Sequence, residues 1–153
     1  MQISRFCLLP LFVAGLAVGV TAASAQDGER RPIRADAPWL NYGSNTMLRT
    51  ALEGVEGIEV LISDVWVPPN ASLETHSHPG EELVYVIEGV AYHREEGQPE
   101  KVYTAGDTLK IGIGKVHSPK TGDEPMRAIV VRIHRAGEPE RYPADPSVLG
   151  LEE

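Results

Sequence analysis

Short apolar runs of strand length follow one another along most of this 153-residue chain, and no segment shows a sustained helical apolar period. Most runs are bounded by Gly, Pro, Asn or Asp, which end strands and form turns. The pattern predicts an all-β fold whose strands close into a barrel or pair in two sheets, so that their edges are protected. The predicted strands are Thr46–Leu52, Ile58–Val67, Leu73–His78, Glu82–Glu88, Val90–Arg94, Lys101–Thr104, Asp107–Ile113 and Met126–His134.

The composition supports this interpretation and excludes one class of partner. Gly (15) and Pro (12) are raised while aromatic residues make up only 6%, which suits short strands and tight turns. The chain has 14 Lys and Arg against 22 Asp and Glu, a formal charge of −8, and no basic run. A nucleic acid is therefore not an expected partner. With 42% hydrophobic residues, the length is enough for one core and one domain.

The first 25 residues have the pattern of a secretory signal peptide: Arg5 gives a positive start, residues 6–20 are apolar, and residues 23–25 are small. An uncleaved membrane anchor is the alternative, but a proline and two glycines interrupt the apolar run. Cleavage after residue 25 predicts a periplasmic or secreted protein without a membrane span. It also removes Cys7, the one cysteine, so the mature chain could form no disulfide.

The remaining chain divides into three parts. Residues 26–38 are charged, contain two prolines and show no apolar period, which predicts a linker or arm. Residues 39–135 hold the predicted strands and form the expected β-barrel domain. Residues 136–153 contain three prolines and are predicted to be a C-terminal tail that wraps the surface or frays.

The polar residues that could carry chemistry begin in the stretch from Thr75 to Gly89. His76 and His78 are two apart on a predicted strand, so both imidazoles project to one face. Pro79 and Gly80 then turn the chain and bring a glutamate alongside. Strand parity alone does not choose between Glu81 and Glu82, because both faces of the following strand are apolar.

A third histidine follows a glycine-rich bend. Gly112 and Gly114 flank this bend and place His117 at the start of the next strand. Three imidazoles and one carboxylate make a mixed nitrogen and oxygen site. Such a site suits Fe(II), Mn(II), Ni(II), Cu(II) or Zn(II).

The first stretch resembles the first motif of the cupin family, which reads G(X)5HXH(X)3,4E(X)6G. The residues that match are His76, His78, Glu82 and Gly89. Three residues separate Glu82 from the histidine pair and six separate it from the glycine, as in the motif. Asn70 stands where the leading glycine is usual.

The second stretch resembles the second cupin motif, G(X)5PXG(X)2H(X)3N. The residues that match are Gly106, Gly114 and His117. Gly112 replaces the proline and Thr121 replaces the asparagine, which affects the shape of the turn and not the ligand types. Sixteen residues, 90–105, separate the two motifs, which is similar to the short spacing of small single-domain cupins.

The resemblance implies a jelly-roll barrel, the double-stranded β-helix of cupins. It implies a divalent transition metal (Fe, Mn, Ni, Cu or Zn) inside the mouth, held by His76, His78, Glu82 and His117. Four protein ligands leave two octahedral positions for water or substrate, which distinguishes a catalytic site from a closed structural one. The resemblance also implies that a homodimer can form by sheet contact or strand exchange.

Simpler readings of the same residues stay open. The His76-Ser77-His78 triplet could be a polar turn with solvated imidazoles. For His93 and His134 an exposed or core-satisfied histidine is the preferred interpretation. Glu81 is interpreted as a solvated carboxylate or one that supports a ligand.

We therefore expect an exported, metal-dependent enzyme, either dioxygenase-like or an isomerase or lyase, that acts on a small oxygenated molecule. The alternative is a non-catalytic cupin that binds or senses a small molecule or metal, and a third is a barrel used as a scaffold. The acidic composition disfavours highly anionic substrates unless the pocket is locally basic. The residues that could make it basic are Lys110, Lys115, Lys120 and Arg132.

Overall fold

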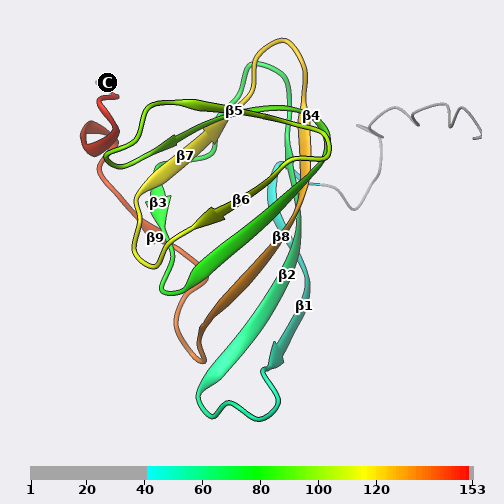
Figure 1. Ribbon diagram of the computed structural model, residues 1–153, viewed down its shortest axis with the longest axis vertical. Coiled ribbons are helices and arrows are strands. Elements are labelled where there is room, and N and C mark those ends of the chain that lie inside the picture. The colour runs from blue at the N-terminus through cyan, green and yellow to red at the C-terminus, as the bar shows by residue number, and fades with distance from the viewer. Residues whose placement is uncertain (1–40, 152–153) are drawn as a thin grey trace, which may run out of the picture. The chain divides into compact units, whose positions relative to one another are not determined.

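A computed structural model describes residues 41–151, which form nine β-strands and one short 3-10 helix (Figure 1). The predicted signal peptide (1–25), the predicted arm (26–38) and the predicted start of the barrel at Trp39 lie outside the described residues. The elements are β1 (Gly43–Ala51), β2 (Ile58–Val67), β3 (His76–Ser77), β4 (Glu81–Glu95), β5 (Lys101–Thr104), β6 (Thr108–Ile111), β7 (His117–Lys120), β8 (Met126–Arg135), β9 (Tyr142–Pro143) and the 3-10 helix η1 (Pro146–Leu149).

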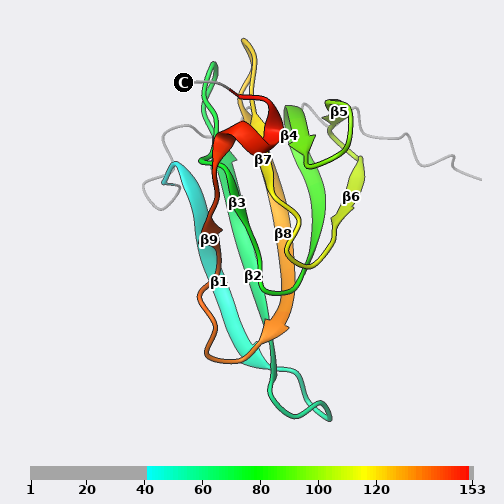
Figure 2. The ribbon, with the colours of Figure 1, turned by 90° about the vertical axis from the view of Figure 1, so that its left-hand side faces the viewer.

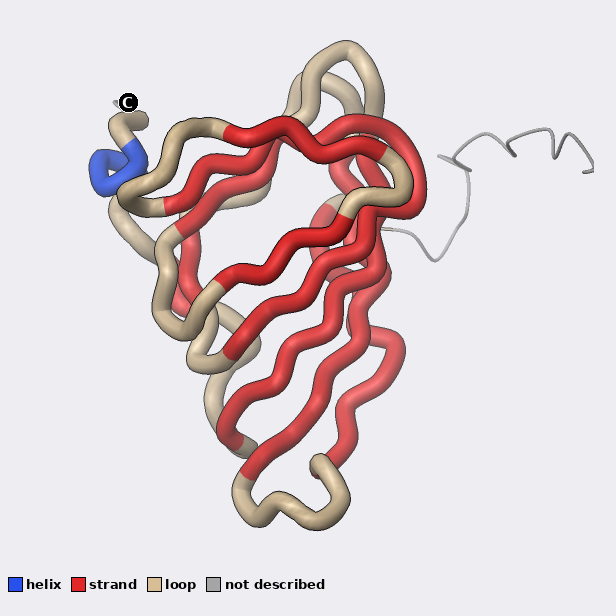
Figure 3. The backbone as a smooth tube through the Cα atoms, viewed as in Figure 1, coloured by secondary structure: helices blue, strands red, loops and turns tan. Residues whose placement is uncertain are grey.

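The strands pair antiparallel in the order β1-β2-β8-β4-β7-β3-β9, and β5 and β6 also pair with β4. Strand β4 belongs to two layers. Up to Gly89 it pairs with β8 and β6, and beyond Gly89 it pairs with β7 and β5. The strands therefore fold over a common interior, as the tube in Figure 3 shows. The predicted all-β jelly-roll fold is confirmed.

The predicted break at Gly89, between the strands 82–88 and 90–94, is wrong, because both belong to one continuous strand, β4. Gly89 has a φ of 76°, and the register shifts by a bulge between Val86 and Glu88. A bulge bends a strand without ending its pairing. The position also needs glycine, because a Cβ there would overlap the carbonyl oxygen of Pro125.

Other strand boundaries also differ from the sequence-based prediction. The predicted strand 73–78 is reduced to the two residues of β3, and 107–113 is reduced to β6. Strand β9 was not predicted, and β7 was expected only as an unbounded strand that His117 begins. Each contains a proline, Pro119 or Pro143, and neither has an apolar alternation that a pattern search could detect.

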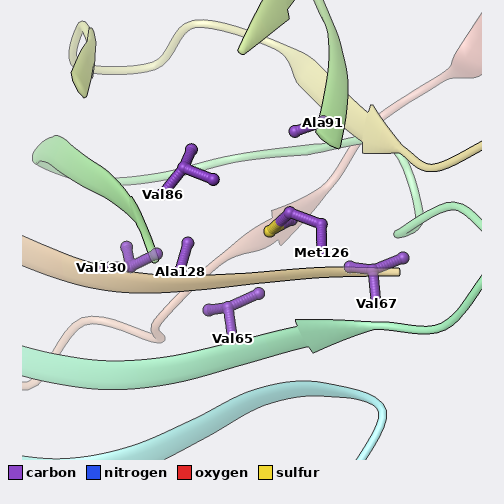
Figure 4. Close-up of a cluster of buried hydrophobic side chains, with 7 residues drawn as sticks. All are labelled: Val65, Val67, Val86, Ala91, Met126, Ala128 and Val130. Carbon is purple, nitrogen blue, oxygen red and sulfur yellow. The ribbon is translucent and has the colours of Figure 1, made fainter. Parts of the chain in front are cut away.

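The apolar core lies between β2, β8 and β4 (Figure 4). Residues of β8 alternate between a buried inner face and a more exposed outer face, as the pleat of a strand requires. Its inner positions are apolar from Met126 to Val130 and become polar at Arg132 and His134. The buried cluster is Val65, Val67, Val86, Ala91, Met126, Ala128 and Val130. The interior thus has an apolar end and a polar end.

The segment after Arg135 wraps back over the polar end. Strand β9 pairs with β3, with Tyr142 opposite Ser77 and Pro143 opposite His76. Figure 2 shows β9 running beside β3. Within residues 41–151, no helix has the length and apolar character needed to cross a membrane.

Candidate metal centre

Two short neighbouring strands bring three histidines together. His76 begins β3 and lies directly opposite His117, which begins β7. His78 follows two residues after His76 and is buried with it. The ring centroids lie 4.3 Å apart for His76 and His117, 4.8 Å for His76 and His78, and 5.2 Å for His78 and His117.

The predicted bend before β7 positions His117. The backbone N–H of Lys115 donates to the carbonyl of Gly112 at 3.2 Å, which closes the turn. The N–H of Gly114, at a φ of 71°, donates to the carbonyl of His78 at 3.0 Å. The bend therefore ties the two histidine stretches to each other through the backbone.

Backbone carbonyls determine which nitrogen of each imidazole carries the proton. The Nδ1 atoms of His76, His78 and His117 lie 2.6, 2.6 and 3.0 Å from the carbonyl oxygens of Glu74, Glu140 and Lys115. A carbonyl oxygen only accepts, so each Nδ1 donates and each neutral ring has its lone pair on Nε2. Metal-bound histidines commonly show this arrangement. One ligand atom from each ring lies within 4.8 Å of the others.

Of the two candidate glutamates, Glu82 points inward. It is 5% exposed and lies opposite Arg132 on the inner face of β4. Glu81 points the other way and forms a partly exposed ion pair with Lys110 at 2.5 Å. The register of β4 against β8 thus resolves the choice that strand parity left open.

The carboxylate of Glu82 lies against two of the imidazoles. Its Oε2 is 2.8 Å from Nε2 of His78, and its Oε1 is 3.9 Å from Nε2 of His117. The buried Nε2 of His78 nevertheless has no hydrogen-bond partner among residues 41–151. Two acceptors this close need a cation, which is either a proton on His78 or a metal ion shared by these side chains. Ligands about 2.0–2.2 Å from a common ion lie roughly 3 Å apart in cis and roughly 4 Å apart in trans, so these spacings fit.

Burial sets the protonation states that a metal requires. It lowers the pKa of His76 to about 3, with His117 adding to the effect, and it lowers the pKa of His117 to about 4. Both imidazoles are therefore neutral near neutral pH. Burial acts to raise the pKa of Glu82, but His78 and Arg132 outweigh it and hold that pKa well below its usual range. The centre thus offers neutral nitrogens and a charged oxygen.

Arg132 is the one member of the predicted basic set that reaches the interior. Its Nε donates to Oε2 of Glu82 at 2.8 Å, and its Nη1 donates to Oε1 of Glu140 at 2.8 Å and to Oγ of Ser63 at 3.1 Å. Lys110 and Lys120 form ion pairs on the surface. Sequence reasoning did not find Glu140, because its partners are distant in the chain.

The other two histidines are buried, which excludes the exposed alternative of the sequence-based interpretation. His93 lies on the inner face of β4, 5.5 Å from the His117 ring; its Nε2 makes no hydrogen bond among the described residues and is 3.6 Å from Oε2 of Glu95. His134 lies on β8; neither ring nitrogen makes a hydrogen bond in the same part of the chain, and Nε2 is 3.5 Å from Oε1 of Glu59. Alternation along these two strands turns both rings inward.

A cavity of about 40 Å³ connects the histidines to the apolar core. Its polar wall includes His76, Glu82, His93 and His117. Its other walls come from aliphatic side chains of β2, β4, β6 and β8. A space of this size holds on the order of three water molecules.

The fold and the site define a class of protein: small jelly-roll barrels with a buried cluster of histidines and a carboxylate. The family model for the cupin domain matches residues 64–132. The chain carries a small cupin domain.

Comparison with curated proteins shows a similarity to the dimethylsulfoniopropionate lyase DddQ of Ruegeria pomeroyi. The two are 31% identical over 67 residues, which are 44% of this chain and 33% of that lyase. This chain therefore matches about a third of the length of that relative.

Solved structures support the same fold. The crystal structure of DddQ from Ruegeria pomeroyi aligns with a TM-score of 0.51 and 23% identity over 63% of this chain and 50% of that one. A cupin-like protein from Thermotoga maritima aligns with a TM-score of 0.53 and 21% identity over 77% of this chain and 88% of that one.

Proposed function

We propose that this chain is a metal-dependent lyase for a small molecule and that His76, His78, His117 and Glu82 hold a divalent transition metal. The observation that supports the metal site most strongly is the convergence of three buried imidazoles with the Glu82 carboxylate, whose Oε2 lies 2.8 Å from Nε2 of His78. In a buried site two such acceptors repel each other unless a cation joins them.

The donor set fits a metal that accepts imidazole and carboxylate ligands, which are Fe, Mn, Ni, Cu and Zn among the common ions. When bound, the ion would act as a Lewis acid on an oxygen of the substrate. The Nδ1 hydrogen bonds would keep the imidazole lone pairs directed at the ion. Arg132 would hold Glu82 in place, and His93 would be free to hydrogen-bond the bound molecule.

A lyase is preferred to the dioxygenase-like enzyme, because the curated relative acts on dimethylsulfoniopropionate as a lyase. Dimethylsulfoniopropionate is thus the first substrate to test. Its cleavage would release dimethyl sulfide, acrylate and a proton. The experiment loads the purified chain with each candidate metal and measures dimethyl sulfide by gas chromatography of the headspace.

We expect release that requires metal and is lost in His117→Ala, while Glu81→Gln retains it. Glu81 is the matched control, because its carboxylate lies on the opposite face of the same strand. Failure to release dimethyl sulfide with every metal, at full occupancy of the site, would contradict this lyase activity.

A second candidate is a non-catalytic barrel that binds a metal or a small molecule. The cavity favours it, because a space that holds on the order of three water molecules is too small for dimethylsulfoniopropionate. Turnover would need side chains at the mouth to move. The two functions are separated by the experiment above, since a binding module would take up metal and show no turnover.

We also propose that the protein is exported to the periplasm or secreted. The proposal rests on the positive, apolar and small-residue succession of residues 1–25. N-terminal sequencing of the protein from its native cells would be expected to begin at Gln26. A chain that starts at Met1 would contradict it.

A further inference from the structure

The C-terminal strap, residues 138–144, lies directly beside the candidate metal centre. Its strand β9 pairs with β3, and the N–H of Ala144 donates to the carbonyl of Thr75 at 3.0 Å (Figures 1 and 2). The strap therefore continues the layer that holds His76. A segment that only covered the surface would not need this pairing.

One residue of the strap, Glu140, contacts the centre in two ways. Its backbone carbonyl accepts from Nδ1 of His78 at 2.6 Å. Its carboxylate accepts from Nη1 of Arg132 at 2.8 Å, and Arg132 Nε donates to Glu82 at 2.8 Å. Glu140 is thus linked to two of the four candidate ligands, to His78 directly and to Glu82 through Arg132.

The opposite side of the Glu140 carboxylate is anchored on β1. Ser44 Oγ donates to Oε1 at 2.7 Å and Thr46 Oγ1 donates to Oε2 at 3.1 Å. The carboxylate thus lies between a guanidinium on one side and two hydroxyl donors on the other, and those hydroxyls belong to residues 94 and 96 positions distant in the chain.

The charges explain why this second carboxylate matters. Arg132 is 5% exposed, and a buried guanidinium needs compensating negative charge. If Glu82 were its one partner, Arg132 would compete with a metal ion for the electron density of that ligand. Because Glu140 shares the guanidinium charge, Glu82 can serve a cation as well.

We propose that Glu140 is a positioning residue of the metal centre, which acts through Arg132 to keep Glu82 available as a ligand. The proposal rests on the proposed metal site. It assigns to the C-terminal strap a role in metal affinity in addition to its packing. The Glu140 carboxylate bonds to Arg132, Ser44 and Thr46 and to none of the four candidate ligands.

The test is Glu140→Gln in the full chain, with Glu138→Gln as the matched control. The glutamine keeps the backbone carbonyl and one acceptor oxygen for Arg132 and Ser44, and it removes the charge and the acceptor for Thr46. Glu138 lies on the same strap, but its carboxylate accepts from the hydroxyl of Tyr142 and contacts no candidate ligand. Competition titration of Co(II) against a chelator gives the affinity, and the Co(II) absorption spectrum reports the ligand geometry.

We expect Glu140→Gln to weaken Co(II) binding by about 10- to 100-fold, the usual cost of losing a group that supports a metal ligand, and to change the spectrum. Glu138→Gln should change the affinity less than about two-fold. Unchanged affinity and spectrum in Glu140→Gln would overturn the proposal.

A milder variant covers the case in which Glu140→Gln does not fold. Thr46→Val removes one hydrogen bond to Glu140 from β1, at a distance from the centre. It should weaken Co(II) binding several-fold with a native thermal transition, and no weakening would overturn the proposal. If the wild-type chain binds no Co(II), the proposed metal site is contradicted. If the wild-type chain and Glu140→Gln bind Co(II) equally tightly, only the proposed role of Glu140 is contradicted.

Discussion

The two ends of the barrel interior are held together by different interactions. The apolar end is packed between the long strands β2, β4 and β8, and its members are buried aliphatic side chains. At the histidine end, the short strands β3, β7 and β9 face polar side chains of β4 and β8, and hydrogen bonds and ion pairs join them. One end relies on area removed from water and the other on directed polar contacts.

This difference separates the consequences of substitution. Apolar packing contributes to the free energy of unfolding without specifying the direction of any single atom. The polar contacts at the other end direct nitrogen and oxygen atoms toward one point. Substitutions at the apolar end should therefore lower stability and leave metal affinity unchanged. Substitutions at the histidine end should mainly lower metal affinity.

Met126→Ala should have the largest effect on stability. Met126 is 4% exposed in the core cluster, and truncating such a side chain costs about 2–5 kcal/mol of unfolding free energy. Denaturant unfolding of the metal-free protein measures the loss, and the metal stoichiometry should stay unchanged. If Met126→Ala abolished metal binding while the protein remained folded, the two ends would not be separable.

Glu82→Gln should have the largest effect on metal binding among single carboxylate changes. The amide keeps the shape and loses the charge, so we expect affinity to fall by about 100-fold or more, roughly 2.7 kcal/mol. Glu81→Gln, one residue earlier and facing outward, should leave affinity within about two-fold. Isothermal titration with Zn(II) distinguishes the two, and equal effects would mean that the inward position of Glu82 has no role.

The metal-free protein should lose stability as the pH falls. His76 and His117 have pKa values of about 3 and about 4 because they are buried, against 6.5 in the unfolded chain. Between about pH 6.5 and about pH 4 the unfolded state binds protons that the native state does not, so unfolding becomes easier. Thermal melts across this window measure it. The slope should be shallower in His76→Gln, and a flat profile in the wild type would contradict the buried, neutral imidazoles.

The smallest effect is expected on the surface. Lys110→Ala combined with Lys120→Ala removes two partly exposed ion pairs outside the cavity. Stability should change by less than about 1 kcal/mol, and metal affinity should not change measurably. A clear loss of affinity would show that surface charge acts on the centre, which the structure does not indicate.

The sequence was most informative where a local rule applies. Two histidines at a spacing of two, a glycine bend before His117, and apolar runs for β2 and β8 each follow from strand geometry over a few residues. For the same reason the predicted and observed bounds of β2 coincide.

The rest depends on contacts that no local pattern contains. The choice of Glu82 needs the register of β4 against β8, and the inward position of His93 needs the bulge near Gly89. The link from Arg132 to Glu140 joins a strand to the proline-rich segment that the sequence predicts to be a C-terminal tail. Long-range pairing of polar groups leaves no periodic signal. The cupin motif therefore indicated Glu82 where the strand pattern did not, and the positions of His93 and Glu140 were found only in the folded chain.

The metal content of the chain tests the central claim most directly. Elemental analysis would be made on the wild-type protein and on His117→Ala, both purified after exposure to the same mixture of candidate metals. The account predicts about one bound transition metal per wild-type chain and almost none in the folded variant. Equal metal content in both proteins, or none in either, would contradict a centre built from these side chains.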